Sequence, residues 1–306
     1  MSEGLRNLNL DSLPNYLNVS RENLDKILSK PEAFYRKIQI EVKGKSRVIC
    51  PPKSPLKEIQ RTILRGIYGH VRWLSCLHGG IPKKSVISNA LCHLNQYLVA
   101  TYDISDFFPN TTNKMIHECF ISMNFEQHIS HILTRLVSVS GTLPLGAPTS
   151  TAIANLVYRP SDILLLKLCK KHNLTYTRYV DDITISGGWD FKHLSQAIRG
   201  DIEILGYKIN SRKIKYFFNH QQQVVTGLVV NKVLSPTPSF LKDTKILIHR
   251  CRTEGPGIVA DEHGFTIQQL RQMISGRIAF IRSVNPKKGR ALRGLLVGIS
   301  WNESKS

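Results

Sequence analysis

The spacing of hydrophobic and polar residues predicts both strands and helices in this chain. Runs rich in aromatic and β-branched residues, typical of strands, occupy residues 34–42, 47–50, 97–103, 176–186 and 224–230. Apolar residues recurring every three or four positions predict helices at residues 20–28, 56–68, 112–140, 191–205 and over most of 239–300. Ser20 has the side chain of an N-cap for the first helix. The pattern therefore predicts an α+β fold whose C-terminal part is helical.

Two adjacent acids interrupt one of the strand segments. Asp181 and Asp182 lie in the middle of the apolar run 176–186, and Gly187-Gly188 follows it. This arrangement predicts a β-hairpin with both carboxylates at or near its turn. Exposing two acids at the tip of an apolar hairpin is costly unless a divalent cation neutralises them. A solvated Asp-Asp turn explains the pair equally well when it is considered alone.

A third acid, Asp103, lies far upstream at the end of the predicted strand 97–103. A strand carrying one Asp beside a hairpin carrying two would form a site of three carboxylates. Such a site can hold two Mg²⁺ ions about 3.5–4 Å apart, the arrangement used for nucleotidyl transfer.

Charge indicates the kind of substrate. The chain has 42 Lys and Arg against 22 Asp and Glu, and residues 207–306 alone carry 17 against 5. An acidic site in a basic protein predicts a polyanionic substrate, although a merely basic surface is the simpler alternative. There is no run of 18 uncharged apolar residues, which argues against a membrane span. The six cysteines lack metal-ligand spacing, which argues against zinc.

Several segments resemble the motifs of reverse transcriptases, in the family's order over about residues 40–230. Residues 103–108 resemble motif A and the Asp181-Asp182 hairpin resembles motif C. Residues 141–155 resemble motif B, with Leu145 where the family commonly has Gln, and 206–213 resemble motif D. Residues 224–230 resemble the primer-grip strand. The resemblance implies a right-hand polymerase fold with an N-terminal extension and fingers (1–95), a palm (96–230) and a basic helical thumb (231–306).

The resemblance also implies roles for individual residues. Metal binding of two Mg²⁺ ions, for which Mn²⁺ can substitute, is implied for Asp103, Asp181 and Asp182, and general-acid catalysis for Lys213. Nucleotide binding is implied for Arg47, Ile104, Phe108 and Gly146. The ring of Phe108 would exclude a 2′-hydroxyl from the incoming dNTP. Each role has a simpler alternative. Arg47 would then be an ordinary exposed arginine, Phe108 a core phenylalanine, and Lys213 one more lysine in a basic stretch.

Two short signatures resemble those of one branch, the retron reverse transcriptases. Asn89, Ala90 and His93 match Asn-Ala-x-x-His, and Val225-Thr226-Gly227 match the second. The resemblance implies a bacterial cytoplasmic enzyme that copies part of a cognate structured non-coding RNA from an RNA 2′-OH into single-stranded msDNA. It also implies an RNA–DNA product and an effector protein in antiphage defence. We expect RNA contacts at Asn89, His93, Thr226, Gly227, Arg271, Arg277 and Arg282.

Other classes of protein remain open at this point. A group II intron-like reverse transcriptase is disfavoured because no maturase or endonuclease segment is recognisable. A catalytically silent RNA-binding protein with the polymerase fold is disfavoured by the intact acids. A two-metal nuclease would use similar carboxylates but would not need Phe108 or motif B.

Overall fold

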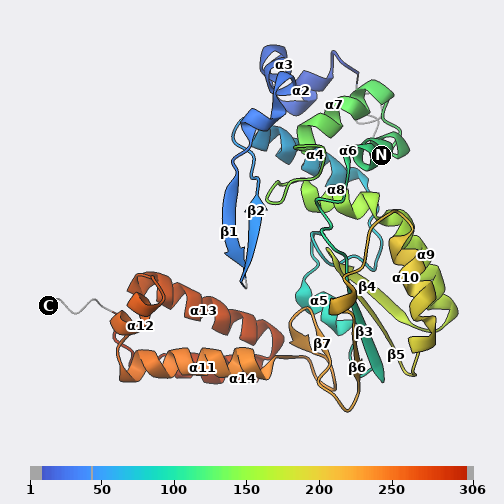
Figure 1. Ribbon diagram of the computed structural model, residues 1–306. Helices are drawn as coiled ribbons and strands as arrows, with labels where there is room; N and C mark the ends of the chain where they lie inside the picture. Colours follow the sequence, from blue (N-terminus) through green and yellow to red (C-terminus); the bar gives the residue numbers. More distant parts are fainter. Residues whose placement is uncertain (1–8, 43, 302–306) are drawn as a thin grey trace. The chain divides into compact units, whose positions relative to one another are not determined.

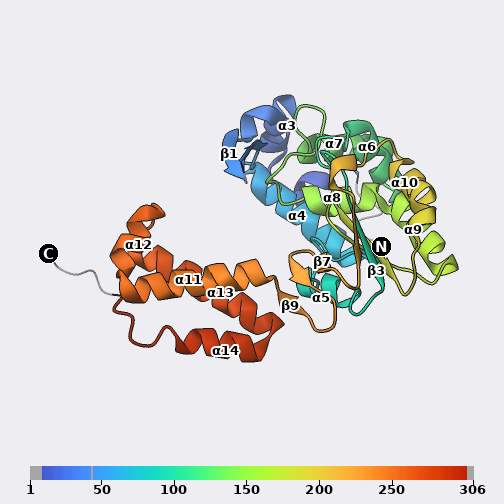
Figure 2. The ribbon, with the colours of Figure 1, turned by 60° about the horizontal axis from the view of Figure 1, so that its bottom comes forward.

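Helices and short strands make up the chain, and the predicted α+β class is confirmed (Figures 1 and 2). The structure is a computed structural model that describes residues 9–42 and 44–301. Within these ranges, no helix is long and apolar enough to cross a membrane.

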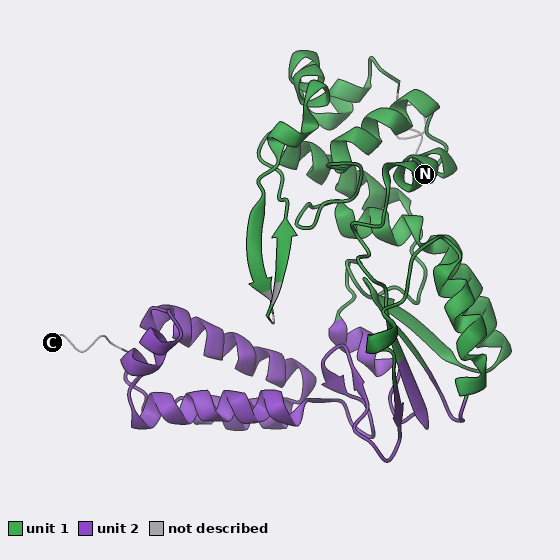
Figure 3. Cartoon of the chain, in the orientation of Figure 1, with its two compact units in different colours: residues 1–85, 101–185, 191–215 green, residues 86–100, 186–190, 216–306 purple. Residues whose placement is uncertain are grey.

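Two compact units divide the chain, and they are interleaved in sequence (Figure 3). Unit 1 contains the described residues of 1–85, 101–185 and 191–215, whereas unit 2 contains those of 86–100, 186–190 and 216–306. The chain therefore passes from one unit to the other at several points. The division into fingers, palm and thumb remains a prediction.

Unit 1 begins with helices and one long hairpin. Its first elements are α2 (Leu13–Leu17), α3 (Arg21–Ser29), the 3₁₀ helix η1 (Pro31–Phe34), β1 (Ile38–Val42), β2 (Lys45–Ile49) and α4 (Leu56–His70). The Ser20 side chain accepts a hydrogen bond from the Asn23 N–H, which confirms it as the N-cap of α3. The two strands pair antiparallel with Ile40 opposite Arg47. Arg47, which was predicted to bind the nucleotide, therefore lies on β2 of this hairpin.

Unit 1 contains further helices. They are α6 (Asn113–Ser122), α7 (Gln127–Val137), α8 (Ser150–Val157), α9 (Arg159–Lys171) and α10 (Ser195–Glu203), with short 3₁₀ turns η2 (Lys192–Leu194) and η3 (Ser211–Lys213). Helices α9 and α10 lie side by side, and α9 also contacts β4 (Thr175–Tyr179) (Figures 1 and 2). The segment 112–140, predicted as helical, is divided near Asn124 into α6 and α7.

A four-stranded sheet carries the acidic residues. Its strand order is β4-β5-β3-β6, with β3 (Leu98–Asp103), β5 (Asp182–Gly187) and β6 (Lys215–Phe218) as the other members. The inner strands β3 and β5 are mostly buried, because side chains on both of their faces are covered. This burial explains why their sequences are so apolar and why Asp103 and Asp182 stand at strand ends.

Unit 2 has a smaller sheet and its own apolar core. The sheet consists of β7 (Val224–Val225), β8 (Leu228–Val229) and β9 (Ser235–Pro236), and α5 (Val86–Leu91) packs on β8. The core joins distant segments of sequence: Ala90, Val99, Val225, Leu228, Val230 and Leu234. The predicted strand 224–230 is therefore a hairpin, because Thr226 and Gly227 both have positive φ and turn the chain.

Four helices end unit 2, and we call them the thumb helices. They are α11 (Pro238–Thr253), α12 (Pro256–Glu262), α13 (Ile267–Val284) and α14 (Pro286–Gly294). Helix α13 starts with a capping box formed by Thr266 and Gln269. Its buried stripe packs against the neighbouring helices, and Trp301 packs on the same core.

Candidate active site

The hairpin formed by β4 and β5 places the two adjacent acids at its tip, as predicted from the sequence. Val180 and Asp181 are the two turn residues, and Asp182 is the first residue of β5. Val180 has φ 60°, in the left-handed region that β-branched residues rarely adopt. We call the segment from Thr175 to Gly187 the active-site hairpin.

Strand β3 brings Asp103 to the active-site hairpin. The Ile104 N–H donates to the backbone carbonyl of Asp181 at 3.0 Å, which ties the end of β3 to the turn. The Lys213 ammonium donates to Asp103 Oδ1 at 2.6 Å. Three residues predicted to act together, Asp103, Asp181 and Lys213, therefore lie in one place.

Electrostatics at Asp181 reflect these neighbours. Burial raises the pKa of the Asp181 carboxyl above its usual value, and the negative charge of Asp103 raises it further. Lys213 and Arg47 oppose this rise, so the arginine of the β1–β2 hairpin also acts on the site. Because burial and a neighbouring carboxylate both disfavour the charged form of Asp181, a cation beside it would be stabilising.

Asp182 is placed differently. Its side chain is exposed, whereas Asp103 and Asp181 are partly buried. Over residues 9–42 and 44–301, no three His, Cys, Asp or Glu side chains are gathered as a metal cluster. An open cavity of about 510 Å³ adjoins Lys213 and is lined by Ser105, Ile209, Asn210, Ser211, Arg212 and Lys213 itself.

The predicted nucleotide-binding residues differ in their exposure to solvent. Phe108 is half-buried and its ring contacts that of the buried Phe107, with centroids 5.7 Å apart. Gly146 is exposed with φ 93°. The Ile104 side chain is only 1% exposed, and the Ile104 N–H donates to the Asp181 carbonyl. The backbone of Ile104 thus connects the end of β3 to the Asp181 turn. Nucleotide binding at Ile104 remains a prediction.

Motif B contacts the base of the β1–β2 hairpin through its backbone. The Cys50 N–H donates to the Leu145 carbonyl at 2.7 Å. A Cβ on Gly146 would lie 3.6 Å from the nitrogen of Pro51, an ordinary contact distance. Leu145, which replaces the family's usual Gln, therefore contributes a contact that does not depend on its side chain.

The first retron signature is internal, which corrects two predictions of RNA contact. Asn89 and His93 are both 0% exposed, so neither side chain can reach RNA. His93 Nδ1 lies 2.7 Å from Ser186 Oγ, and the Asn89 amide donates to Thr226 Oγ1 at 3.4 Å. The signature residues join α5 to β5 and to the β7–β8 turn.

The second signature contributes the surface of that turn. Thr226 is half-buried and donates to the Val86 carbonyl at 3.2 Å, whereas Gly227 is exposed. RNA contact at these two residues remains a prediction.

The three predicted thumb arginines do not share one face. Arg271 and Arg282 line an open cavity of about 720 Å³ together with Arg290, Arg293 and Trp301. Arg277 instead places its guanidinium over the ring of Phe240, 4.6 Å from the centroid. The cavity gathers four arginines, and sequence reasoning had singled out only two of them.

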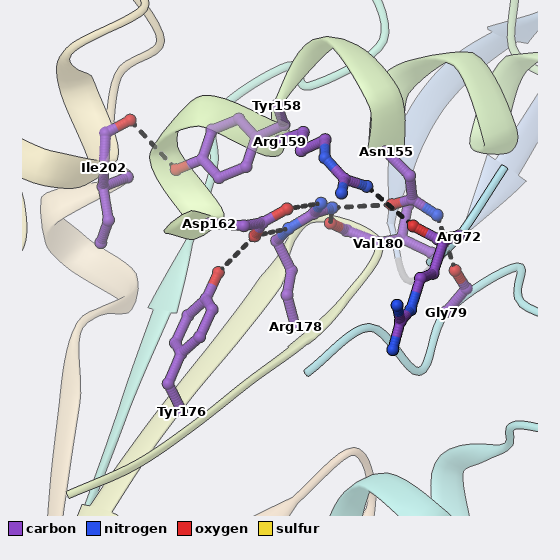
Figure 4. Close-up of polar contacts among 10 residues, drawn as sticks. All are labelled: Arg72, Gly79, Asn155, Tyr158, Arg159, Asp162, Tyr176, Arg178, Val180 and Ile202. Carbon is purple, nitrogen blue, oxygen red and sulfur yellow. Dashed lines mark hydrogen bonds and ion pairs between the residues drawn. The ribbon is translucent and has the colours of Figure 1, made fainter. Parts of the chain in front are cut away.

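A buried polar network behind the active-site hairpin was missed by sequence reasoning (Figure 4). Its centre is an ion pair between Arg178 and Asp162, both 0% exposed. A signal was present, since Arg178 lies within a predicted strand rich in aromatic and β-branched residues, and a buried charge requires a partner. The separation of Arg178 and Asp162 in sequence concealed the pairing.

Comparisons with known proteins agree with this geometry. The chain is 29% identical over 299 residues to the Retron Se72 reverse transcriptase of Salmonella heidelberg, covering 94% of this chain and 78% of that protein. It is 30% identical over 240 residues to the Retron Ec86 reverse transcriptase of Escherichia coli, covering 74% and 75%. No protein-family model matches the chain.

Solved structures support the fold. Apo telomerase from Candida tropicalis matches with a TM-score of 0.51 at 9% identity, covering 85% of this chain and 58% of that one. A form truncated from its C-terminal domain gives 0.50 at 11% identity, covering 66% and 55%. The fold is therefore the α+β fold of right-hand polymerases.

The fold is one that template-directed polymerases have. The chain belongs to the retron reverse transcriptases, and it is accordingly an RNA-directed DNA polymerase with an RNA template. Family membership decides between the branches of reverse transcriptase that the motifs left open. It also removes the catalytically silent alternative.

Proposed function

We propose that the chain makes DNA by two-metal nucleotidyl transfer at Asp103, Asp181 and Asp182. The observation that carries this proposal is the placement of Asp103 beside the Asp181 turn, with the Lys213 ammonium 2.6 Å from Asp103 Oδ1. Oxygen donors of this kind suit Mg²⁺, and the raised pKa of the Asp181 carboxyl indicates a site that a cation would stabilise. Reverse transcriptases in general require a divalent metal.

Mg²⁺ held by these carboxylates would activate the attacking 3′-hydroxyl and neutralise charge at the phosphates. The protein's own groups supply orientation and protons. Asp103 and Asp181 are fixed to each other through the backbone of Ile104. Arg47 would attract the triphosphate of a dNTP, and Lys213 would give a proton to the leaving pyrophosphate. Phe108 would lie under the sugar.

Replacement of Asp181 by Asn tests the site. The variant keeps the shape of the turn but loses a charge, so we expect DNA synthesis to fall by at least about 1,000-fold, or roughly 4 kcal/mol in transition-state energy. RNA binding should persist. Asp25→Asn is the matched control, because Asp25 is an exposed acid of α3 paired only with Arg21 at 3.5 Å. Normal extension of a primed RNA template by the Asp181 variant would overturn the assignment.

The product that we propose is msDNA, copied from a cognate non-coding RNA and primed by a 2′-OH of that RNA. Support comes from membership of the retron family and from the cavity of the thumb helices, whose four arginines suit a phosphate backbone. An effector protein in antiphage defence is part of the same proposal.

Co-expression with the neighbouring non-coding RNA tests the retron product. We expect one short DNA of defined length that keeps a few ribonucleotides after RNase treatment. A debranching enzyme should release them, because the proposed link is a 2′–5′ bond. The Asp181→Asn variant, expressed in the same way, should give no such DNA. If the wild-type enzyme extends primed templates but yields no RNA-linked DNA in these cells, the proposed priming is wrong.

A further inference from the structure

Arg178 lies directly before Tyr179 in β4 and is completely buried. Its guanidinium forms a two-point pair with Asp162, with Nε to Oδ1 at 2.8 Å and one terminal nitrogen to Oδ2 at 2.6 Å. Tyr176 also donates to Asp162 Oδ1, at 2.6 Å. Burial alone would lower the pKa of the guanidinium, but the charge and hydrogen bonds of Asp162 more than offset burial, and the pKa is raised. Arg178 is therefore a fixed cation.

The remaining terminal nitrogen of Arg178 points at the turn (Figure 4). It donates to the Val180 carbonyl and to Asn155 Oδ1, both at 2.8 Å. The Asn155 amide in turn donates to the Gly79 carbonyl at 3.0 Å. One side chain thus links the turn to α8 and α9, and through α8 to the loop that contains Gly79.

The turn needs such support because its conformation is unfavourable for its sequence. A two-residue hairpin turn with positive φ at its first position favours Gly there, and this chain has Val180. Left to itself, a β-branched residue would leave this region of φ, and the flanking Asp181 would move with it.

The Gly79 loop closes the other side of the turn. A Cβ on Gly79 would lie 2.4 Å from the Val180 nitrogen and 2.9 Å from the Tyr179 carbonyl carbon, so no side chain fits there. The His78 N–H donates to the Arg178 carbonyl at 2.9 Å, which keeps this loop against β4. The turn therefore contacts the Arg178 guanidinium through the Val180 carbonyl and packs closely against Gly79.

We propose that Arg178 is a positioning residue for DNA synthesis: it holds the Val180-Asp181 turn in its left-handed conformation and thereby aims the Asp181 carboxylate at Asp103. Asp162 and Asn155 fix the guanidinium for this task. The inference rests on the proposed metal site, because the conformation of the turn affects DNA synthesis only if Asp181 acts there.

A purely stabilising role is the competing explanation, and the physics of buried ion pairs separates the two. A buried pair replaced by apolar residues of similar size often leaves stability unchanged or raised. If the network serves only stability, an apolar replacement that folds should be fully active. If it positions the turn, the folded replacement should be impaired.

The test is the triple variant Arg178→Met, Asp162→Leu and Tyr176→Phe, which removes the charges and the hydroxyl together. We expect about 100-fold slower extension, which is the scale of a 1 Å misplacement of a catalytic group. We also expect a severalfold higher Mg²⁺ concentration for half-maximal activity, with an unchanged melting temperature and RNA affinity. Wild-type rate and Mg²⁺ requirement in the folded triple variant would overturn the proposal.

Addition of Val180→Gly to the triple variant is the second arm. Glycine adopts positive φ without cost, so the turn would no longer depend on Arg178. We expect recovery of at least tenfold in rate relative to the triple variant. If the rate does not recover, Arg178 does not act through the turn and the proposal is wrong.

A further variant covers the case in which the triple variant does not fold. Asn155→Ala keeps the ion pair but removes one anchor of the guanidinium and the hydrogen bond to the Gly79 carbonyl. We expect it to lower the melting temperature moderately, because buried polar groups lose a partner, and to raise the Mg²⁺ requirement of the folded enzyme. An unchanged requirement would contradict the proposal. Asp181→Asn separates the two hypotheses: if that variant polymerises normally, the metal site itself fails, whereas an inactive Asp181 variant beside a fully active triple variant rejects only the role of Arg178.

Discussion

Two neighbouring phenylalanines show how one residue position separates support from function. Phe107 is buried among aromatic rings, with centroids 5.6 Å from Tyr158 and 5.3 Å from Tyr207. Phe108 leans on Phe107 and remains half-exposed. A ring that rests on a rigid cluster cannot retreat when a bulkier sugar arrives. Phe108 therefore has the surroundings that a steric filter for the 2′-hydroxyl requires.

Truncation of Phe108 should relax the choice of sugar. In Phe108→Ala we expect the ratio of ribonucleotide to deoxyribonucleotide incorporation to rise about 100-fold or more, because a clash is removed without loss of any specific contact. Single-nucleotide extension with each substrate measures the ratio. Phe265→Ala, at a phenylalanine 39% exposed before α13, is the control. Unchanged selectivity in an active Phe108 variant would place the filter elsewhere.

For single residues, the sequence predicted which acidic side chains lie together better than it predicted which polar side chains are buried. Asp103 and Asp181 were found because acids are rare in apolar strands, and their meeting follows from one strand pairing with another. RNA contact was expected at Asn89 and His93, but both side chains are buried, because a short polar pattern does not show which positions in and after α5 are covered. Arg178 was missed because its partner is known only from the fold.

Among the elements, α13 and α14 approach each other unusually closely. Gly289 of α14 is buried, and a Cβ there would lie 2.4 Å from both Cα and Cβ of Arg282 on α13. The obstructing atoms belong to the helix itself and cannot swing aside. Glycine at this position therefore sets the spacing of the two helices.

Gly289→Ala should destabilise the thumb helices. We expect a loss of about 1–3 kcal/mol, because overpacking forces the backbones apart. The matched control is Gly276→Ala on α13, where no atom lies within 4 Å of the added Cβ and helix propensity favours Ala by up to about 1 kcal/mol. Chemical unfolding monitored by circular dichroism compares the two. Equal stability of both variants would contradict the close packing.

Longer elements were predicted more reliably than short ones. The helical block after residue 238 and the active-site hairpin follow from sustained periodicity. Strand β6 has four residues and β9 has two, and such short strands carry too little pattern to be recognised. Strands β7 and β8, of two residues each, were predicted as one strand over 224–230, and the turn between them was missed. Helix boundaries in the thumb coincide with Gly255-Pro256 and with Asn285-Pro286, signals that are local and therefore readable.

At the scale of the molecule, the formal net charge of +20 is the dominant property. Exposed arginines on α13 and α14 gather at one cavity. Neighbouring cations repel one another unless a polyanion lies between them. We therefore expect this cavity to contribute to RNA binding, whereas Arg277 contributes less because it is engaged with Phe240.

Neutralising the cavity should change how salt affects RNA binding. For the triple variant Arg271→Gln, Arg282→Gln and Arg293→Gln we expect weaker binding and a shallower plot of log affinity against log salt. The slope should fall by about one unit for each phosphate that the variant no longer neutralises. Binding titrations at several salt concentrations measure both. The control neutralises three exposed lysines of unit 1, namely Lys26, Lys114 and Lys170. If control and test variants have the same slope, the RNA binds elsewhere.

The interleaving of the two units could not be foreseen from composition or motif order. Linear boundaries assign residues 86–100 to the segment around them, yet they pack with residues 216–306. Only long-range packing shows this, since the apolar residues of α5 and β3 look the same whichever core they join.

Interleaving also has a consequence for the nascent chain on the ribosome. Ala90 and Val99 are covered by Val225, Leu228 and Val230, which are synthesised more than a hundred residues later. At typical elongation rates of about 5–20 residues per second, their apolar faces wait roughly ten seconds for native cover. If translation stops before residue 216, those apolar faces remain exposed to solvent permanently. Translation speed across this interval should therefore govern how much of the protein escapes aggregation.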